Sequence, residues 1–220
     1  MISIREILKI SPVMPVIVLD HVADAVPLAQ ALVTGGIRVL EVTLRTPAAL
    51  DCVKAIRAAV PDAIVGVGTI GSVADFNAAR AAGALFGVSP GATAALLAHA
   101  AACDFPYLPG VMTPSEAMQA LAAGFTALKL FPAKQAGGIE MLKAIGGPFP
   151  QLLFCPTGGI DAESAAHYLA RPNVACVGGS WLAPANLVAQ KNWAEITRRA
   201  ELACQLAVIY KTPTTAIDSS

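Results

Sequence analysis

A lysine lies inside an apolar segment in the second half of the chain. Lys129 has two apolar neighbours on each side, and Pro132 ends the run. If the segment is a strand, the ammonium group is buried, and burial disfavours its charged form. A neutral amine is a nucleophile that condenses with ketones to form a Schiff base. The alternative is a lysine on an edge strand, or one whose ammonium group reaches water beyond its apolar stem.

A carboxylate occupies a comparable position in the first half of the chain. Glu41 lies in the apolar run 37–42, and charged side chains are rarely buried unless they are paired. Arg38 is one candidate partner, but side chains at 38 and 41 point to opposite faces of a strand. Positions 41, 43 and 45 share one face of the strand. We therefore predict that Glu41, Thr43 and Arg45 line the same opening at the carboxyl end of that strand. Glu41 is the candidate acid/base.

Two diglycine segments follow the last two predicted strands. Gly158 and Gly159 precede a helix expected to start near Asp161, and Gly179 is followed by Ser180. Backbone N–H groups at a helix N-terminus bind anions. The glycines could also serve tight turns alone. Because two such segments end neighbouring strands, we predict a site for phosphate or another anion.

These groups together predict one kind of substrate. Lysine forms the imine, the carboxylate moves protons, and arginine holds a substrate carboxylate through paired hydrogen bonds. The glycine segments hold a terminal phosphate. A keto acid that carries phosphate at its far end fits this set, and the natural reaction is carbon–carbon cleavage beside the imine, which accepts the electrons of the departing carbanion.

A repeated strand-and-helix pattern positions these residues. Short apolar runs alternate with alanine-rich helical stretches eight times, and a short amphipathic helix precedes the first run. The predicted strands are 13–19, 37–42, 63–67, 84–88, 107–108, 126–130, 152–155 and 174–177. The predicted helices are 22–34, 47–59, 72–82, 92–102, 114–122, 138–145, 161–169 and 191–208.

This pattern predicts an α/β protein with parallel strands. We expect a single (β/α)8 barrel (TIM barrel) over residues 1–211, with its site at the carboxyl ends of the strands. The polar tail 212–220 is expected to be disordered. A doubly wound open sheet is the alternative, but the first strand-to-helix turn lacks the Gly-x-Gly-x-x-Gly pattern of dinucleotide sites.

Composition excludes several classes of function. The 220 residues are 55% hydrophobic and 14% charged, with a formal net charge of zero. No basic cluster indicates nucleic acid, and no apolar run reaches the ~20 residues that span a bilayer. The five cysteines form no Cys-x-x-Cys pair, which indicates neither a zinc site nor a disulfide framework and favours reduced thiols in the cytoplasm. We expect no metal ligand set.

The chain resembles the 2-keto-3-deoxy-6-phosphogluconate aldolases, a family also active on 2-keto-4-hydroxyglutarate. The resemblance covers roughly residues 10–205. Its most specific segments are GIRVLEVTLR at 36–45 and GFTALKLFPA at 124–133. Supporting segments are GVGT at 66–69, SPG at 89–91, PG at 109–110, FCPTGGI at 154–160 and GGSWL at 178–182.

The resemblance implies class I aldol chemistry without a metal or cofactor. Lys129 matches the Schiff-base lysine of the family, and Glu41 matches its acid/base. The matching binding residues are Arg45 and Thr69 for the pyruvate carboxylate, Pro90 and Phe131 for the pyruvate pocket, Thr157 beside the substrate chain, and Gly158, Gly159, Gly179 and Ser180 for phosphate. The implied products are pyruvate and glyceraldehyde 3-phosphate, in a cytoplasmic homotrimer. 2-Keto-4-hydroxyglutarate would give pyruvate and glyoxylate.

Two positions depart from the family pattern. Ala127 and Lys134 stand where family members often carry acidic residues, and neither is among the reacting groups. Sister aldolases that act on the galactonate epimer share the lysine, the glutamate and the glycines. Two other functions remain open: a phosphosugar isomerase or epimerase that uses Glu41 for proton abstraction, and a barrel that binds phosphorylated metabolites without chemistry.

Overall fold

The structure, a computed structural model, describes residues 2–211 and the side chains of residues 2–206; the predicted tail 212–220 lies outside the described residues. The strands are β1 (Val13–Ile17), β2 (Val39–Thr43), β3 (Ile64–Gly68), β4 (Gly87–Val88), β5 (Tyr107–Leu108), β6 (Gly110–Val111), β7 (Ala127–Leu130), β8 (Leu153–Pro156) and β9 (Val177–Gly179). The helices are α1 (Ile4–Ile10), α2 (Val22–Thr34), α3 (Ala49–Ala59), α4 (Val73–Ala81), α5 (Ala94–Ala101), α6 (Pro114–Ala122), α7 (Gly138–Gly146), α8 (Ala162–Leu169), α9 (Ala185–Ala189) and α10 (Trp193–Lys211).

The strands form two parallel sheets, so the prediction of one closed eight-stranded TIM barrel is wrong. Six strands are ordered β5-β4-β3-β2-β1-β9, and three are ordered β6-β7-β8. Pro109, which has no N–H, separates β5 from β6. β5 pairs with β4, and β6 pairs with β7. At the other junction, near β8 and β9, the described residues form only isolated bridges, Phe154 with Val174 and Thr157 with Gly178.

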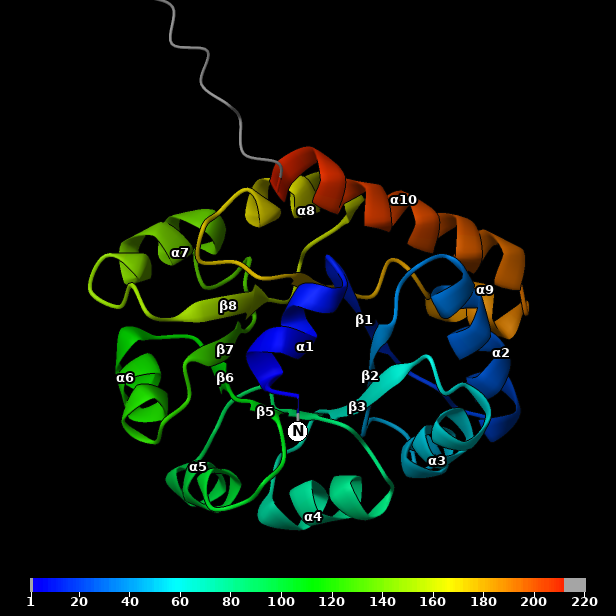
Figure 1. Cartoon of the computed structure of the whole chain (residues 1–220), viewed down its shortest axis with the longest axis horizontal. Helices are drawn as coiled ribbons and strands as arrows, with labels where there is room; N and C mark the ends of the chain where they lie inside the picture. The colour runs from blue at the N-terminus through cyan, green and yellow to red at the C-terminus, as the bar shows by residue number, and fades with distance from the viewer. Residues whose placement is uncertain (1, 212–220) are drawn as a thin grey trace, which may run out of the picture.

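The helices surround the strands, and α1 lies across one end of them (Figure 1). A capping box between Ser3 and Glu6 starts α1. Its Arg5 guanidinium donates to the carbonyls of Thr126 and Gln151, at 2.8 and 3.1 Å, which lie just before β7 and β8. The short N-terminal helix predicted from the sequence therefore covers the amino ends of these strands and leaves the carboxyl ends open.

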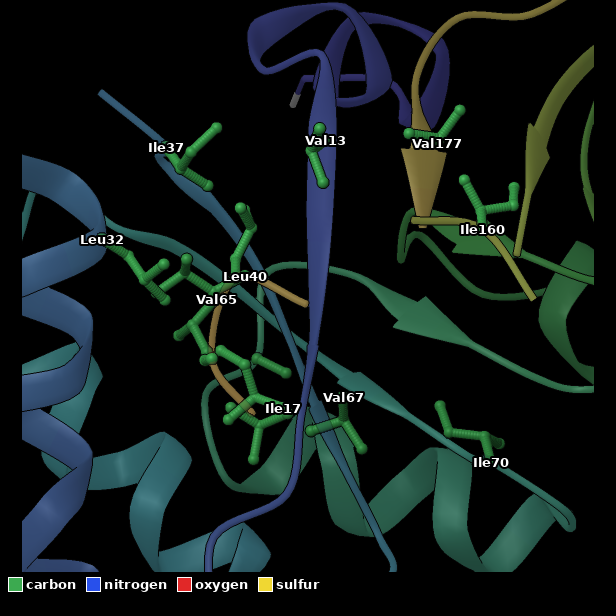
Figure 2. Close-up of a cluster of buried hydrophobic side chains, with 14 of the residues drawn as sticks. Val13, Ile17, Leu32, Ile37, Leu40, Val65, Val67, Ile70, Ile160 and Val177 are labelled. Carbon is green, nitrogen blue, oxygen red and sulfur yellow. The ribbon is translucent and has the colours of Figure 1, made fainter. Parts of the chain in front are cut away.

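Buried side chains form two layers because neighbouring strand residues point to opposite faces. One layer lies between the strands and the surrounding helices and includes Val13, Leu40 and Val65 together with Leu32 of α2 (Figure 2). The other lies on the opposite face of the strands. Its members are Ile7, Leu8, Met14, Val39, Phe86, Val88, Leu108, Ala127, Leu153, Cys155, Ala175 and Cys176. Burial on both faces explains the high hydrophobic content.

Several element boundaries differ from those predicted. The fourth strand is confined to Gly87–Val88, and the last strand is Val177–Gly179 rather than 174–177. Gly178 and Gly179 therefore lie within β9, where they pair with Met14 and Pro15, and not in a loop after it. The final helix is preceded by a separate short helix, α9. None of the helices in residues 2–211 has the combined length and hydropathy needed to cross a membrane.

Candidate active site

The alternation of side chains along β2 and β7 directs two charged residues to the same interior. On β2, Leu40 and Val42 belong to the layer beneath the helices, so Glu41 between them points the other way. On β7, Leu128 and Leu130 also belong to that layer, so Lys129 points inward too. The charged residues take the inward positions because their apolar neighbours occupy the helix-facing layer.

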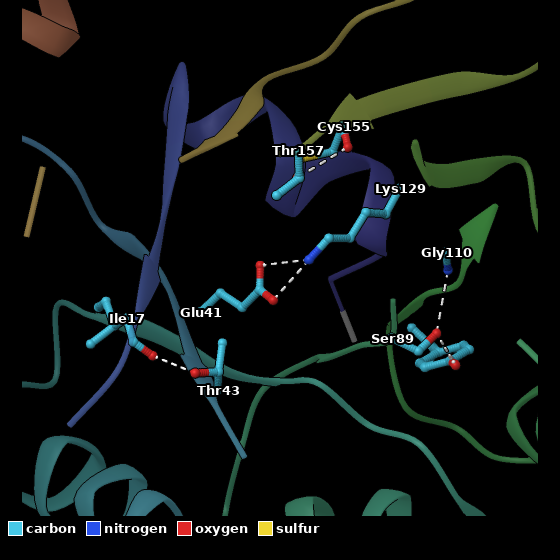
Figure 3. Close-up of polar contacts among 9 residues, drawn as sticks. Ile17, Glu41, Thr43, Ser89, Gly110, Lys129, Cys155 and Thr157 are labelled. Carbon is cyan, nitrogen blue, oxygen red and sulfur yellow. Dashed lines mark hydrogen bonds and ion pairs between the residues drawn. The ribbon is translucent and has the colours of Figure 1, made fainter. Parts of the chain in front are cut away.

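Lys129 and Glu41 form a buried ion pair. The ammonium nitrogen Nζ lies 3.0 Å from Oε1 and 3.4 Å from Oε2 of Glu41. Dashed lines mark both contacts in Figure 3. The two residues are only 4% and 1% exposed. Arg38, the alternative partner considered above, is exposed and donates to the carbonyl of Asp62 instead. Neither charge reaches water, so each depends on the other for its compensation.

This geometry is suited to proton exchange. A hydrogen-bonded carboxylate can accept a proton from the ammonium group, which leaves a neutral, nucleophilic amine. The Phe131 ring centroid lies 5.4 Å from Nζ, within the range in which an aromatic face attracts a cation. The site therefore combines a potential nucleophile with an adjacent base in a water-poor interior.

Gly68 provides the space that Glu41 occupies. A Cβ atom at position 68 would overlap the carboxylate of Glu41, and Gly68 pairs with Thr43 in the β2–β3 register. Thr43 does not serve the open mouth as predicted, because it is fully buried and its hydroxyl donates to the carbonyl of Ile17 at 2.8 Å (Figure 3). Thr43 instead ties β2 to β1 beside the ion pair.

A cavity of about 110 Å³ gathers most of the other predicted site residues. The predicted residues that line it are Arg45, Phe131, Thr157, Gly158, Gly159, Gly179 and Ser180. Val16, Ile160 and Gly178 complete the lining. The cavity thus joins an arginine, an aromatic ring and both glycine segments, and Phe131 connects it to the Lys129 ammonium group.

The two glycine segments have different conformations. Gly158 and Gly159 have φ values of 105° and 72°, in the region that glycine adopts without strain. Gly178 lies in β9, where a Cβ atom would overlap the side chain of Thr157. The following helix, α8, is capped by Asp161, whose side chain accepts from the Ser164 N–H at 2.8 Å. Anion binding would therefore rely on the loop amides rather than on the capped helix end.

Hydrogen bonding also fixes the charge state of this cap. The bonds from Ser164 hold the pKa of the Asp161 carboxyl below its usual value. The predicted helix start at Asp161 is confirmed. The Asp161 carboxylate places a negative charge close to the predicted phosphate loop.

Two predicted residues do not line this cavity. Thr69 follows β3 with φ of 64°, an unusual conformation for threonine, and is partly exposed. Pro90 follows β4, is exposed, and approaches Gly110 so closely that a Cβ atom there would overlap the Pro90 carbonyl. Both residues lie at carboxyl ends of strands, as predicted.

A buried hydroxyl network escaped the sequence analysis. The Tyr107 hydroxyl donates to Ser89 Oγ at 2.6 Å, and the Gly110 N–H donates to the same oxygen at 3.3 Å. Gly110 is the register partner of Lys129, so the network braces the backbone beside the ion pair. Burial raises the pKa of Tyr107 to about 12. The signal in the sequence was a polar residue, Ser89, directly after an apolar strand.

The comparison with protein families agrees with this geometry. The family model described as KDPG and KHG aldolase matches residues 4–199. The chain belongs to this aldolase family.

Within the described part of the chain, no group of three or more histidine, cysteine, aspartate or glutamate residues could hold a metal ion.

Relatives in this aldolase family cover nearly the whole chain. A 2-dehydro-3-deoxy-phosphogluconate aldolase of Pseudoalteromonas atlantica is 49% identical over 92% of the chain and 94% of that protein. The KHG/KDPG aldolase of Escherichia coli is 46% identical over 92% of the chain and 95% of that protein. A crystal structure of KDPG aldolase from Legionella pneumophila, with pyruvate captured as a covalent carbinolamine, has a TM-score of 0.91 and 46% identity. It matches 92% of this chain and 98% of that one.

Proposed function

We propose that the chain is a class I aldolase that cleaves 2-keto-3-deoxy-6-phosphogluconate to pyruvate and glyceraldehyde 3-phosphate. The observation that carries the proposal is the buried pair of Lys129 and Glu41, 3.0 Å apart, beside a cavity that holds Arg45 and the glycine loops. An amine and a base in contact are what imine formation requires. Membership of the aldolase family supports the same reaction.

The first half of the reaction forms the imine. Glu41 takes a proton from Lys129, and the neutral Nζ attacks the C2 ketone to give a carbinolamine. Loss of the former ketone oxygen as water then gives a protonated imine. The Legionella relative was captured with pyruvate as a covalent carbinolamine, the intermediate that this step requires.

The second half breaks the carbon–carbon bond. Glu41, acting through a water molecule, removes the proton of the C4 hydroxyl, and the C3–C4 bond breaks. Its electron pair moves into the imine to give an enamine, while C4 leaves as the aldehyde of glyceraldehyde 3-phosphate. Protonation of C3 and hydrolysis of the imine release pyruvate and restore the amine.

The remaining residues hold the substrate in this proposal. Arg45 and Thr69 bind the carboxylate, because a guanidinium can form paired hydrogen bonds with it. Pro90 and Phe131 line the pyruvate end. The far end is held by Thr157, Gly158, Gly159, Gly179 and Ser180. Arg45 lines the same cavity as the glycines.

The test is pyruvate release from purified substrates. We expect turnover of the phosphogluconate substrate and also of 2-keto-4-hydroxyglutarate, which gives pyruvate and glyoxylate, because the name of the Escherichia coli relative includes both substrates. The galactonate epimer, assayed in parallel, measures the selectivity at C4. Lys129→Met should be inactive, whereas Lys143→Met, which changes an exposed lysine paired with Glu140, should be fully active. Folded protein that releases no pyruvate from any of the three would overturn the proposal.

Assembly and location complete the proposal. We infer one domain over residues 1–211, because a single hydrophobic cluster runs from Val13 to Ala203. We infer a cytoplasmic homotrimer by analogy with the family. Met112 and Met118 are large apolar side chains that are 39% and 57% exposed, and a subunit contact would cover them. Light scattering that gives the mass of a single chain would contradict the trimer.

A further inference from the structure

The segment after β7 is bonded to the diglycine loop. The Ala133 N–H donates to the Thr157 carbonyl at 2.8 Å, and the Lys134 N–H donates to the Gly158 carbonyl at 3.1 Å. These bonds continue the β7–β8 pairing, which ends with Leu130 beside Pro156. The backbone of Lys134 is therefore fixed against the loop that the proposed function assigns to phosphate.

The side chain of Lys134 covers one residue of that loop. A Cβ atom placed on Gly159 would lie 2.7 Å from Cβ and 2.9 Å from Cδ of Lys134. Contacts of this kind mean that the lysine stem packs directly on the glycine. The stem of Lys134 therefore lies against the diglycine loop, which lines the cavity.

The charge of Lys134 is uncompensated in the described residues. Lys54, Lys129 and Lys143 each form an ion pair with a carboxylate, and Lys134 forms none. Lys134 is exposed, so its ammonium group can move without breaking a contact. No carboxylate lines the neighbouring cavity, and Arg45 is the charged residue among its lining residues. Arg45 therefore lines the cavity and Lys134 packs on the adjoining loop, where Asp161, two positions after Gly159, is a nearby carboxylate.

We propose that Lys134 binds the terminal phosphate of the substrate from the open side of the diglycine loop and sets the preference for phosphorylated over unphosphorylated substrates. The proposal rests on the proposed function. The loop amides hold the phosphate by fixed hydrogen bonds, whereas Lys134 adds a mobile charge on a flexible stem. Such a charge acts on binding and not on the chemical step, since Lys134 packs on the diglycine loop and the reacting amine belongs to Lys129.

The test compares two substrates with the same carbon chain, 2-keto-3-deoxy-6-phosphogluconate and 2-keto-3-deoxygluconate. In Lys134→Met, we expect the KM for the phosphorylated substrate to rise about 3- to 10-fold, as for loss of one exposed or partly exposed charge contact. We expect kcat for it, and kcat/KM for the unphosphorylated substrate, to stay unchanged. Lys134→Glu should raise KM further, and Lys134→Arg should restore most of the binding.

Salt and a matched variant separate this effect from a structural one. Because exposed charges are screened within ~8 Å at physiological ionic strength, the difference in KM should shrink as salt rises. Lys9→Met makes the same charge change on α1, at the amino end of the strands, and should leave both substrates unaffected. Equal effects of Lys134→Met on both substrates, or no effect on either, would overturn the proposal. Pyruvate trapping on Lys129 tests the proposed function separately, because pyruvate carries no phosphate.

Discussion

The ammonium nitrogen of Lys129 lies 3.0 Å from a carboxylate oxygen of Glu41, although 88 positions separate the two residues in the chain. Both side chains are buried, so the removal of one partner leaves an uncompensated charge in the interior. The pair is therefore a structural element as well as the proposed catalytic one. Mutations can separate the two contributions, because activity needs the amine and stability needs only charge balance.

Lys129→Met should abolish turnover and also destabilise the fold. Loss of one partner of a buried ion pair costs about 3–5 kcal/mol, which chemical denaturation can measure. The double variant Lys129→Met/Glu41→Gln removes both charges and should recover most of that stability while it stays inactive. Turnover in the single variant, or a double variant no more stable than the single one, would contradict this account of the pair.

Glu41→Gln should slow the reaction without a change in side-chain shape. Positioned acid/base groups contribute ~10²–10⁴-fold to a rate, so we expect kcat to fall within that range. Steady-state kinetics on the phosphogluconate substrate would measure the effect, with circular dichroism as a control for folding. If kcat is unchanged, Glu41 has no part in proton transfer.

Gly68→Ala should reduce activity although it alters no reacting group. The added methyl would overlap the Glu41 carboxylate and displace it from Lys129, and misplacement of a catalytic group by ~1 Å can cost on the order of 10²-fold in rate. Gly71→Ala is the matched control, since a Cβ atom there makes only an ordinary contact, 3.6 Å from Asp75. Equal activity of the two folded variants would show that Glu41 tolerates displacement.

Tyr107 should make stability depend on pH in the alkaline range. Its pKa is raised from 10.0 to about 12 in the folded protein because the phenol is buried. Folding therefore favours the neutral phenol. The contribution of Tyr107 to the free energy of unfolding is complete below pH 10 and is lost as pH rises toward 12. This difference between the unfolded and folded pKa of Tyr107 corresponds to about 3 kcal/mol of stability.

Tyr107→Phe provides the control for this pH dependence. The variant loses the hydrogen bond to Ser89, which should cost about 1 kcal/mol at neutral pH, and its stability should fall less steeply above pH 10. The difference between the two unfolding curves removes the contribution of other titrating groups. Parallel curves for both proteins would contradict the assignment to Tyr107.

The strand pattern correctly predicted that Glu41 and Lys129 lie on strands, whereas it predicted the closure of the sheet wrongly. The apolar neighbours of Glu41 and Lys129 indicated that both residues lie on strands. In the structure, both side chains point to the same interior, where they form an ion pair. The closed barrel was wrong because closure depends on hydrogen bonds at the junctions. Apolar periodicity does not report those bonds, whereas Pro109, visible in the sequence, removes one N–H at a junction.

The side chains that pack against glycines could not be predicted from the sequence. The sequence pattern predicts a loop at 178–179, but both glycines pair with β1 as part of β9. Gly178 makes room there for Thr157 and Gly179 for the Trp181 ring. Likewise, alternation along the strand predicts Thr43 at the open carboxyl end, yet its hydroxyl donates to the Ile17 carbonyl. Periodicity gives the direction of a side chain and not the partner that it meets.

Borohydride reduction in the presence of pyruvate tests the central claim most directly. If Lys129 forms an imine, reduction links the pyruvyl group to its nitrogen, and peptide mass spectrometry should locate the adduct on the peptide that contains Lys129. The proposal predicts this adduct in the native chain and in Lys134→Met, and its absence in Lys129→Met. Folded native protein that gains no adduct, or gains it on another lysine, would contradict the Schiff-base mechanism.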